Sequence, residues 1–539
     1  MRDRASVVVP IARWRAAFLG TFLAVLIVKL WLAASLAPFT DEAFYWQESR
    51  HLAWGYSDLP PMTAWLIRLG ESVAGHGVLG MRWPFLVLGS VLPWLVVAFA
   101  RESFDDGSGW QAGLFSLLLP LAGSLGVLAV PDVPLTVAIM LAMLAFQRAV
   151  TRDRMRDWLL LGIALALAWM THYRAAMAML VGLLFMLGSE RGRGLWRRPG
   201  FWMAMLFAAV GLVPLAVSNW LQHGAGVAFQ LVQRNPWSFH VDALVQPLEQ
   251  AIACTPVLYG LLLWVGWVSW RRRNLGGPWD LLAFVALGFI GLYFVLGLFA
   301  DDLRFRVHWP LPGYLPLLAG LPVLLRWPGG SPRLRWLTGL ALGVATLGLA
   351  AGLGYLALAS TPVGARQLAG FKAFPYAFAG WREAGALVAR GAVQEPGAVL
   401  VADNFALAAE LDFQFDGRRK VYSLDSPLNV KHGRAPQLAI WQLDEVALRR
   451  GHAGEPMLLA VEETAQRERQ RLLWLGTLCE RIDAPRLLGR LDAFDGRKRF
   501  ALYVGRVPGG PLPSVQSSAQ QRQGCEIWRR AHAAEESMR

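Results

Sequence analysis

Long apolar runs recur through the first 360 residues of the chain and constrain its fold more than any other feature. Most of them are about 20 residues long, which as an α-helix is enough to cross about 30 Å of hydrocarbon. Charged residues make up only 17% of the chain and hydrophobic residues 55%, whereas soluble domains carry about 25% charge. A soluble globular fold is therefore excluded, and we predict a polytopic α-helical membrane protein.

The apolar runs can be placed along the chain by hydropathy. The expected spans are 16–37, 83–100, 110–129, 133–147, 158–187, 201–221, 251–270, 279–299, 309–326 and 336–358. The run 158–187 is interrupted by Thr171-His172-Tyr173-Arg174, so we expect two short helices there. The first run has basic flanks but no small-residue cleavage site, and we expect it to be retained as an anchor.

The net charge of +14 comes almost entirely from arginine, and its distribution favours membrane topology over nucleic-acid binding. Arginines cluster in the N-terminal tail and in the loops 148–156, 191–198, 271–273 and 326–335. The positive-inside rule places these loops in the cytoplasm. Because both flanks of 158–187 are basic, that run must cross an even number of times. We predict about eleven spans, with a cytoplasmic N-terminus and the C-terminus outside.

Beyond about residue 360 the apolar runs shorten to strand length and alternate with helical patterns. The expected strands are 398–402, 420–423, 457–461 and 500–506, and the expected helices are 381–390, 405–411 and 462–475. This alternation predicts a small α/β domain. We therefore assign 1–359 to a transmembrane domain, 360–507 to an extracytoplasmic α/β domain, and 508–539 to a disordered tail rich in Pro, Gly, Ser and Gln.

Two familiar kinds of functional motif do not occur in the sequence. The three cysteines, Cys254, Cys479 and Cys525, show neither metal-ligand spacing nor an evident disulfide framework. There is no Gly-rich phosphate loop of the Walker or dinucleotide-binding type. The chemistry must be sought in the ionisable residues beside the spans.

Two adjacent carboxylates, Asp41 and Glu42, follow directly after the first apolar run, and Asp58 follows in the same loop just before Pro60-Pro61. Carboxylates at a membrane surface are costly to desolvate, so they stay solvated, pair with a cation or take part in function. The structural alternative is that Asp41 and Glu42 cap the helix that follows, because Asp is a good N-cap and acids suit a first turn.

The predicted topology brings further ionisable residues to the same outer face. Asp132, in Pro131-Asp132-Val133-Pro134, is the one charge between two apolar spans, and helix capping is again the alternative. The other residues are His172, Tyr173, Arg174, Arg304, Arg306 and His308. Cations beside a membrane interface suit a lipid phosphate, although arginines also anchor spans by snorkelling.

These residues carry a family resemblance. The stretch Asp41-Glu42-Ala43-Phe44-Tyr45-Trp46, followed by Gly55-Tyr56-Ser57-Asp58-Leu59-Pro60-Pro61, resembles the first outer loop of bacterial GT-C glycosyltransferases. These are relatives of the dolichyl-phosphate-mannose protein mannosyltransferases and of the aminoarabinose transferases that modify lipid A. Pro131-Asp132-Val133-Pro134 and His308-Trp309-Pro310 resemble later motifs. The resemblance covers about residues 20–325 and implies a GT-C fold.

The resemblance also implies an activity. Such enzymes transfer a hexose or pentose, with inversion, from a polyprenyl-phosphate donor to an envelope lipid such as lipid A, a glycan or a protein, on the periplasmic face of the bacterial inner membrane. Asp41 is implied as the general base, Glu42 as a residue that orients Asp41 or the acceptor, and Asp132 as a contact to the sugar or the acceptor. The implied substrate-binding residues are Tyr45, Asp58, His172, Tyr173, Arg174, Arg304, Arg306 and His308.

One position departs from the family pattern. Leu59 stands where the family often has a basic residue, which shifts phosphate binding onto Arg304 or Arg174. Some relatives bind a divalent metal through the acid at the Asp58 position and a later histidine, here His308 or His240. One acid and one unplaced histidine make a weak metal site, and we predict no required metal or other cofactor.

Two other functional classes compete with the glycosyltransferase. A transporter or flippase for a lipid-linked precursor tends to carry ionisable pairs at mid-membrane and inverted repeats. Here the acids lie at span ends, and no internal repeat is evident. A non-catalytic scaffold whose α/β domain binds a partner leaves the positions of Asp41 and Asp132 unexplained. The sequence therefore favours the enzyme, with membrane lipids and not nucleic acid among its partners.

Overall fold

The structure is a computed structural model that describes residues 11–229, 238–299, 307–326, 332–466, 468–510, 512 and 527. The chain divides into two compact units. The first unit consists of Met1–Ala34 and Leu52–Tyr355, and the second of Ser35–His51 and Leu356–Arg539. The second unit is therefore discontinuous in the sequence, because it contains a short segment from the N-terminal region.

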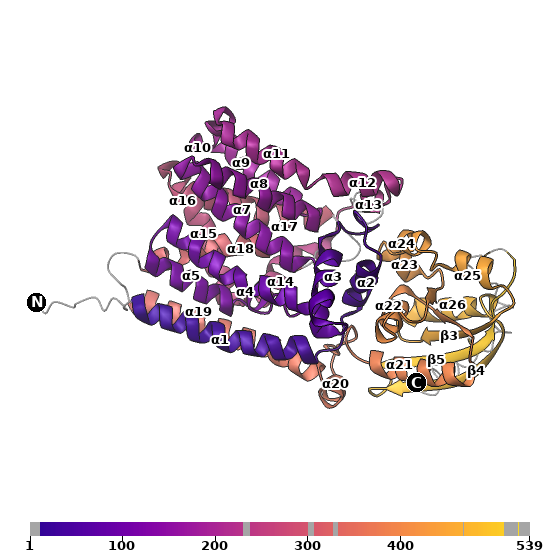
Figure 1. Ribbon diagram of the computed structural model, residues 1–539. Helices are drawn as coiled ribbons and strands as arrows, with labels where there is room; N and C mark the ends of the chain where they lie inside the picture. The colour runs from indigo at the N-terminus through magenta and orange to yellow at the C-terminus, as the bar shows by residue number, and fades with distance from the viewer. Residues whose placement is uncertain are drawn as a thin grey trace, which may run out of the picture. The chain divides into compact units, whose positions relative to one another are not determined.

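The first unit is helical (Figure 1). Its elements are α1 Ile11–Ser35, α3 Met62–Ala74, α4 Val78–Ser103, α5 Asp106–Leu118, α6 Pro120–Gly123, α7 Asp132–Arg152, α8 Met155–Thr171, α9 Ala175–Gly188, α10 Glu190–Arg193, η1 Leu195–Arg197, α11 Pro199–Val210, α12 Val213–Leu221, α13 Ala225–Ala228, η3 Val241–Val245, α14 Gln246–Cys254, α15 Pro256–Arg272, η4 Arg273–Leu275, α16 Pro278–Ala286, η5 Leu287–Leu292, α17 Tyr293–Phe299, α18 Leu311–Leu325 and α19 Pro332–Ala359.

Within the described residues, six helical segments are each long and apolar enough to cross a membrane. They are Ile11–Ser35, Val78–Ser103, Asp132–Arg152, Pro199–Leu221, Pro278–Phe299 and Pro332–Ala359. The number rises to eight if each of two bent helix pairs, 175–197 and 241–275, forms one span. The multi-pass membrane fold is therefore confirmed, whereas the exact number of about eleven spans stays a prediction.

The break predicted in the run 158–187 is present. Helix α8 ends at Thr171, and α9 begins at Ala175. The backbone N–H of Ala175 donates to the carbonyl of His172, which closes the connection between the two helices. Helix α7 packs against α4, α8 and α18 and is buried along most of its length. Residues at the start of α7 and between α8 and α9 are thus held on a rigid part of this unit.

The second unit is an α/β fold. Its elements are α2 Thr40–Arg50, α20 Pro362–Leu368, α21 Trp381–Gln394, β1 Val399–Ala402, α22 Phe405–Gln414, β2 Val421–Ser423, α23 Pro427–Lys431, α24 Ala435–Ile440, α25 Glu445–His452, β3 Pro456–Glu462, α26 Glu468–Thr477, η6 Leu478–Glu480, β4 Asp483–Ala493 and β5 Lys498–Arg506.

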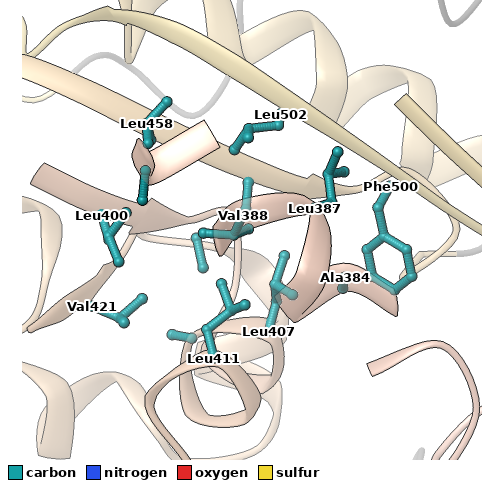
Figure 2. Packing of buried hydrophobic residues seen from close by; sticks show 14 of the residues in the cluster. Ala384, Leu387, Val388, Leu400, Leu407, Leu411, Val421, Leu458, Phe500 and Leu502 are labelled. Carbon is teal, nitrogen blue, oxygen red and sulfur yellow. The ribbon is translucent and has the colours of Figure 1, made fainter. Parts of the chain in front are cut away.

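The five strands form one mixed sheet in the order β2-β1-β3-β5-β4. Strand β1 is parallel to β2 and β3, and β5 is antiparallel to β3 and β4. Because side chains alternate between the two faces of a strand, Leu400 faces a core with α21 and α22, whereas Val401 faces one with α25 and α26. Figure 2 shows the first core, with labelled side chains from α21, α22 and the strands.

The predicted strands 398–402, 420–423, 457–461 and 500–506 all match strands of this sheet. Strand β4 was not predicted, and the helix expected at 462–475 begins only at Glu468. Strand β4 is an edge strand with two register shifts against β5, and its burial is irregular. It therefore lacks the alternating apolar pattern that marks a strand in sequence.

Two further expectations concern the C-terminal region. Most of the predicted disordered tail 508–539 lies outside the described residues, although Ile527 is described and is buried in the core that contains Val401. Cys479 is disulfide-bonded, so the expectation of no evident disulfide was wrong for this residue. Cys254 is a buried free thiol, and Cys525 lies outside the described residues.

Candidate active site

Asp41 lies in the first turn of α2 and remains accessible. The N-cap of the helix is Phe39, not Asp41, and the Asp41 side chain keeps 34% of its exposure. Glu42 is fully buried, and its Oε2 accepts a 2.9 Å hydrogen bond from the backbone N–H of Phe39. The capping explanation therefore holds for Glu42, whereas Asp41 makes no such cap and presents its carboxylate to solvent.

Helix α2 is held by the α/β fold of its own unit. Its Ala43 and Phe44 are fully buried in a cluster with Phe405, Ala406 and Ala409 of α22. Burying apolar surface contributes about 25 cal/mol per Å². An isolated helix as short as α2 is marginal in water, so this packing is what makes the helix stable.

A hydrogen bond and an aromatic contact orient the same helix. The side-chain amide of Gln47 donates a 2.8 Å hydrogen bond to Oδ2 of Asp412. Burial raises the pKa of Asp412 to about 6. Trp46 packs edge-on against Phe413, with ring centroids 5.3 Å apart. These contacts fix the rotation of α2 about its axis, and hence the direction in which Asp41 points.

Arg434 contacts the acidic face of α2. One guanidinium nitrogen, Nη2, donates a 3.3 Å hydrogen bond to Oδ1 of Asp41, and Nη1 lies 3.6 Å from Oε1 of Glu48. The guanidinium also lies 5.1 Å from the ring centroid of Tyr45. Tyr45, a predicted substrate contact, is itself buried. It therefore supports Arg434 in this structure.

A second cluster lies in the helical unit and is centred on Asp132. Nη2 of Arg174 donates a 2.6 Å hydrogen bond to Oδ1 of Asp132, and Nε2 of His308 lies 3.2 Å from the same oxygen. Pro131 is the N-cap of α7, and no side chain caps this helix. The capping explanation for Asp132 therefore fails, and its carboxylate is paired with two nitrogen groups from other segments.

Arg174 keeps an unused donor in this cluster. Its guanidinium lies 5.4 Å from the ring centroid of Trp309, within the range of a cation–π contact. Its Nε is buried and makes no hydrogen bond to the described residues. A buried donor without a partner costs about 1–3 kcal/mol. An anionic ligand oxygen at Nε would remove that cost, which makes Arg174 a candidate anion-binding residue.

His172 and Tyr173 support the turn that carries Arg174. Nδ1 of His172 accepts a 3.1 Å hydrogen bond from the backbone N–H of Arg174. Burial raises the pKa of Tyr173, and the negative charge of Asp58 raises it further. Asp58 is buried in the same unit. Asn219 donates to the Tyr173 hydroxyl at 3.4 Å. The predicted residues 172–174 and Asp58 thus belong to one neighbourhood.

Two predicted residues, Arg304 and Arg306, lie outside the described residues. Among the residues that are described, no three His, Cys, Asp or Glu side chains gather in a way that could hold a metal ion. The expectation that Asp58 with His240 or His308 holds no required metal stays a prediction.

Arg434 and Trp309 are the contributors that the sequence analysis did not identify as site residues. Arg434 is 393 positions from Asp41 in the chain and stands in a polar turn, Lys431-His432-Gly433-Arg434, which has the composition of a solvated loop. Trp309 was noted only as part of the motif beginning at His308. The sequence offered one signal for Trp309, namely that this aromatic residue stands next to His308 in a segment expected to bind an anion.

Comparisons with known proteins agree with this architecture. A family model described as dolichyl-phosphate-mannose-protein mannosyltransferase matches residues 58–218. The structure resembles the crystal structure of ArnT from Cupriavidus metallidurans bound to undecaprenyl phosphate, with a TM-score of 0.64, 14% sequence identity, and coverage of 93% of this chain and 99% of that one. The predicted resemblance to the GT-C superfamily is confirmed.

Two curated relatives are similar in sequence to this chain. The lipid A galacturonosyltransferase RgtD of Rhizobium johnstonii is 26% identical over 301 residues, which are 54% of this chain and 62% of that protein. The undecaprenyl phosphate-alpha-4-amino-4-deoxy-L-arabinose arabinosyl transferase of Pseudomonas aeruginosa is 29% identical over 337 residues, 58% of each chain. The chain thus spans about three fifths of the length of each relative.

Proposed function

We propose that this protein is a membrane glycosyltransferase that moves a hexose or pentose from a polyprenyl-phosphate donor to an envelope acceptor, namely lipid A, another glycan or a protein. The observation that carries the proposal is the accessible Asp41 carboxylate, held on a helix whose other acids, Glu42 and Glu48, are buried. The names of the two curated relatives support the choice of a lipid-linked sugar and of lipid A.

In the proposed mechanism Asp41 is the general base. The acceptor hydroxyl gives its proton to the Asp41 carboxylate as its oxygen forms a bond to the anomeric carbon. The bond from that carbon to the phosphate oxygen breaks, and the electron pair leaves with the polyprenyl phosphate. A single displacement of this kind inverts the configuration at the anomeric carbon. Glu42 contributes by capping α2, and thus by keeping the Asp41 backbone in place.

Arg174 is the proposed phosphate-binding group of the helical unit. Its buried Nε provides a donor for a phosphate oxygen, and hydrogen bonds from arginine to phosphate are charge-assisted and strong. Asp132 and Trp309 hold the guanidinium from two sides. Asp132 and His308 can then contact the sugar or the acceptor. Arg304 and Arg306 are kept as proposed contributors to phosphate binding from the sequence alone.

The proposed location is the bacterial inner membrane, with the N-terminus cytoplasmic and the α/β domain 360–507 periplasmic. The arginine-rich loops support this orientation. So does the disulfide at Cys479, because disulfides persist in oxidising compartments such as the periplasm and are rare in the cytosol.

We expect topology reporters to confirm this orientation. An alkaline phosphatase fusion after Ser360 should be active, because that enzyme folds only outside the cytoplasm, and a fusion in the loop 191–198 should be inactive. A green fluorescent protein reporter at the same two positions should give the opposite pattern. An active cytoplasmic reporter after Ser360 would show that the number of spans is wrong, first of all in the region 158–187.

We further expect that transfer needs no divalent metal. Treating the purified protein with EDTA and removing the chelator should leave turnover within about twofold of the untreated protein, since metal sites require several well-placed ligands. Mg²⁺, Mn²⁺ and Ca²⁺ should each be added back to the treated sample. A loss of turnover that one of these ions restores would contradict the expectation and would direct attention to Asp58.

Turnover of defined donors tests the function itself. The purified protein in detergent would be incubated with lipid A and either undecaprenyl phosphate-4-amino-4-deoxy-L-arabinose or a polyprenyl-phosphate galacturonate. Sugar-modified lipid A and free polyprenyl phosphate should form together in equal amounts, and a wider panel of sugars and acceptors follows if neither donor reacts. Movement of an intact donor across liposome membranes, without release of its sugar, would support the transporter instead.

A further inference from the structure

Arg434 is held in place by the fold of the C-terminal unit. It precedes α24, and Gly433 before it has a φ of 72°, which favours glycine. The backbone N–H of Arg434 donates to the carbonyl of Asn429 at 2.8 Å. The buried Asn429 side chain also accepts from the backbone N–H of Phe405 and donates to the carbonyl of Leu424. The backbone of Arg434 is thus tied to β2 and α22.

The side chain of Arg434 is fixed as firmly as its backbone. It retains only 4% of its exposure, and its guanidinium lies 4.2 Å from the ring centroid of Phe44 and 5.7 Å from that of Phe405. A buried arginine without counter-charges is very costly. Asp41 and Glu48 supply those charges, and they are seven residues apart on α2, so both lie on one face of the helix.

The carboxylates of Glu48 and Asp41 differ in their exposure to solvent. Glu48 is fully buried, so its charge serves to neutralise Arg434. Asp41 shares only Oδ1 with Arg434 and keeps about a third of its side-chain exposure. Because a guanidinium is planar and rigid, the bond to Oδ1 restrains the orientation of the Asp41 carboxylate.

We propose that Arg434 is a positioning residue for the Asp41 carboxylate, supplied by the C-terminal α/β unit. The inference rests on the proposed role of Asp41 as the base. It assigns a role in the reaction to the part of this unit that follows Leu356, in which the sequence analysis identified no catalytic residue. Arg434 does not touch the reacting atoms; it keeps α2 in place and aligns the carboxylate that does.

Hydrogen–deuterium exchange of the full-length protein in detergent tests the anchoring part without any substrate. In Arg434→Gln, the amides of residues 40–50 should exchange at least about tenfold faster than in the wild type. The matched control is Arg481→Gln. Arg481 is also buried and paired with a glutamate, Glu445, but it lies against Trp474 of α26. The control should leave exchange in 40–50 unchanged.

Turnover with the donor and acceptor found active for the wild type tests the positioning part. Arg434→Gln should lower kcat by about 10- to 100-fold, as expected when a reacting group is misaligned, with KM for the donor within about twofold of the wild type. Arg481→Gln should keep kcat. Combining Arg434→Gln with Asp41→Asn should cause no loss beyond Asp41→Asn alone, because Arg434 acts through that carboxylate.

Several outcomes would overturn the proposal. They are unchanged exchange in 40–50, unchanged kcat in a folded Arg434→Gln protein, an equal loss in Arg481→Gln, or additive losses in the double variant. If Arg434→Gln does not fold, Arg434→Lys takes its place; lysine keeps the charge but not the planar contact, and its kcat should still fall. Full activity in Asp41→Asn would refute the proposed base, whereas full activity in Arg434→Gln alone would refute only this inference.

Discussion

Replacing Asp41 with asparagine is expected to lower sugar transfer by about 10²- to 10⁴-fold, the usual contribution of a general base. Asparagine keeps the size of the side chain and an oxygen that can accept the bond from Arg434, but it cannot take up a proton. The Asp41 side chain is a third exposed, so its ion pair adds only modestly to stability. The rate of transfer and the melting temperature should be measured on the same sample, and only the rate should change strongly.

A matched control separates catalysis from a general effect of losing a first-turn acid. Asp106 stands in the first turn of α5, is 59% exposed and pairs with Arg101. Asp106→Asn should therefore leave turnover within about twofold of the wild type, since exposed pairs contribute little. Wild-type turnover in a folded Asp41→Asn protein would exclude Asp41 as the base and with it the proposed mechanism.

Arg174→Gln should weaken binding of polyprenyl phosphate by about 10- to 100-fold, because a hydrogen bond to a charged group contributes about 1.5–3 kcal/mol. Glutamine retains a polar amide near Asp132 but loses both the positive charge and the buried Nε donor. Undecaprenyl phosphate alone serves as the probe, and its dissociation constant can be measured by thermal shift or calorimetry. In the transfer assay, KM for the donor should rise by a similar factor.

Arg191 offers the corresponding control in the same unit. It pairs with the buried Asp280 of α16, so Arg191→Gln also breaks an Arg–Asp pair and should lower the melting temperature. It should leave the affinity for undecaprenyl phosphate unchanged, because Arg191 lies in a different part of the chain. Equal affinity in wild type and Arg174→Gln would return Arg174 to the role of an interfacial anchor.

Many helices of the first unit were predictable, because a helix that crosses a membrane can be recognised by its apolar composition. The break between α8 and α9 was predictable because Thr171-His172-Tyr173-Arg174 interrupts the apolar run and because both flanks of 158–187 are basic, so that an odd number of crossings would put one flank on the wrong side. The same reasoning grouped Asp132, Arg174 and His308 on one face, and the structure brings their side chains together. The individual hydrogen bonds were beyond sequence reasoning, because they depend on where each short loop turns.

Two properties of helix α2 could not be predicted from the sequence. Asp41 and Glu42 are adjacent and suit capping and catalysis equally well, so only their positions after Phe39 distinguish a buried cap from an accessible carboxylate. The segment 35–51 was assigned to the membrane domain because it lies among the spans. Its membership of the α/β unit follows from the apolar contacts of Ala43 and Phe44, which no local pattern reveals.

That membership has a consequence for biosynthesis. Helix α22, which covers Phe44, begins at Phe405 and leaves the ribosome about 350 residues after α2 is complete, a delay of roughly 20–70 s at 5–20 residues per second. An eleven-residue helix such as α2 has little stability alone, so it waits unfolded while the spans insert. We therefore expect a protein truncated after α19 to insert normally but not to order Asp41, so that completion of the chain assembles the helix that carries the proposed base.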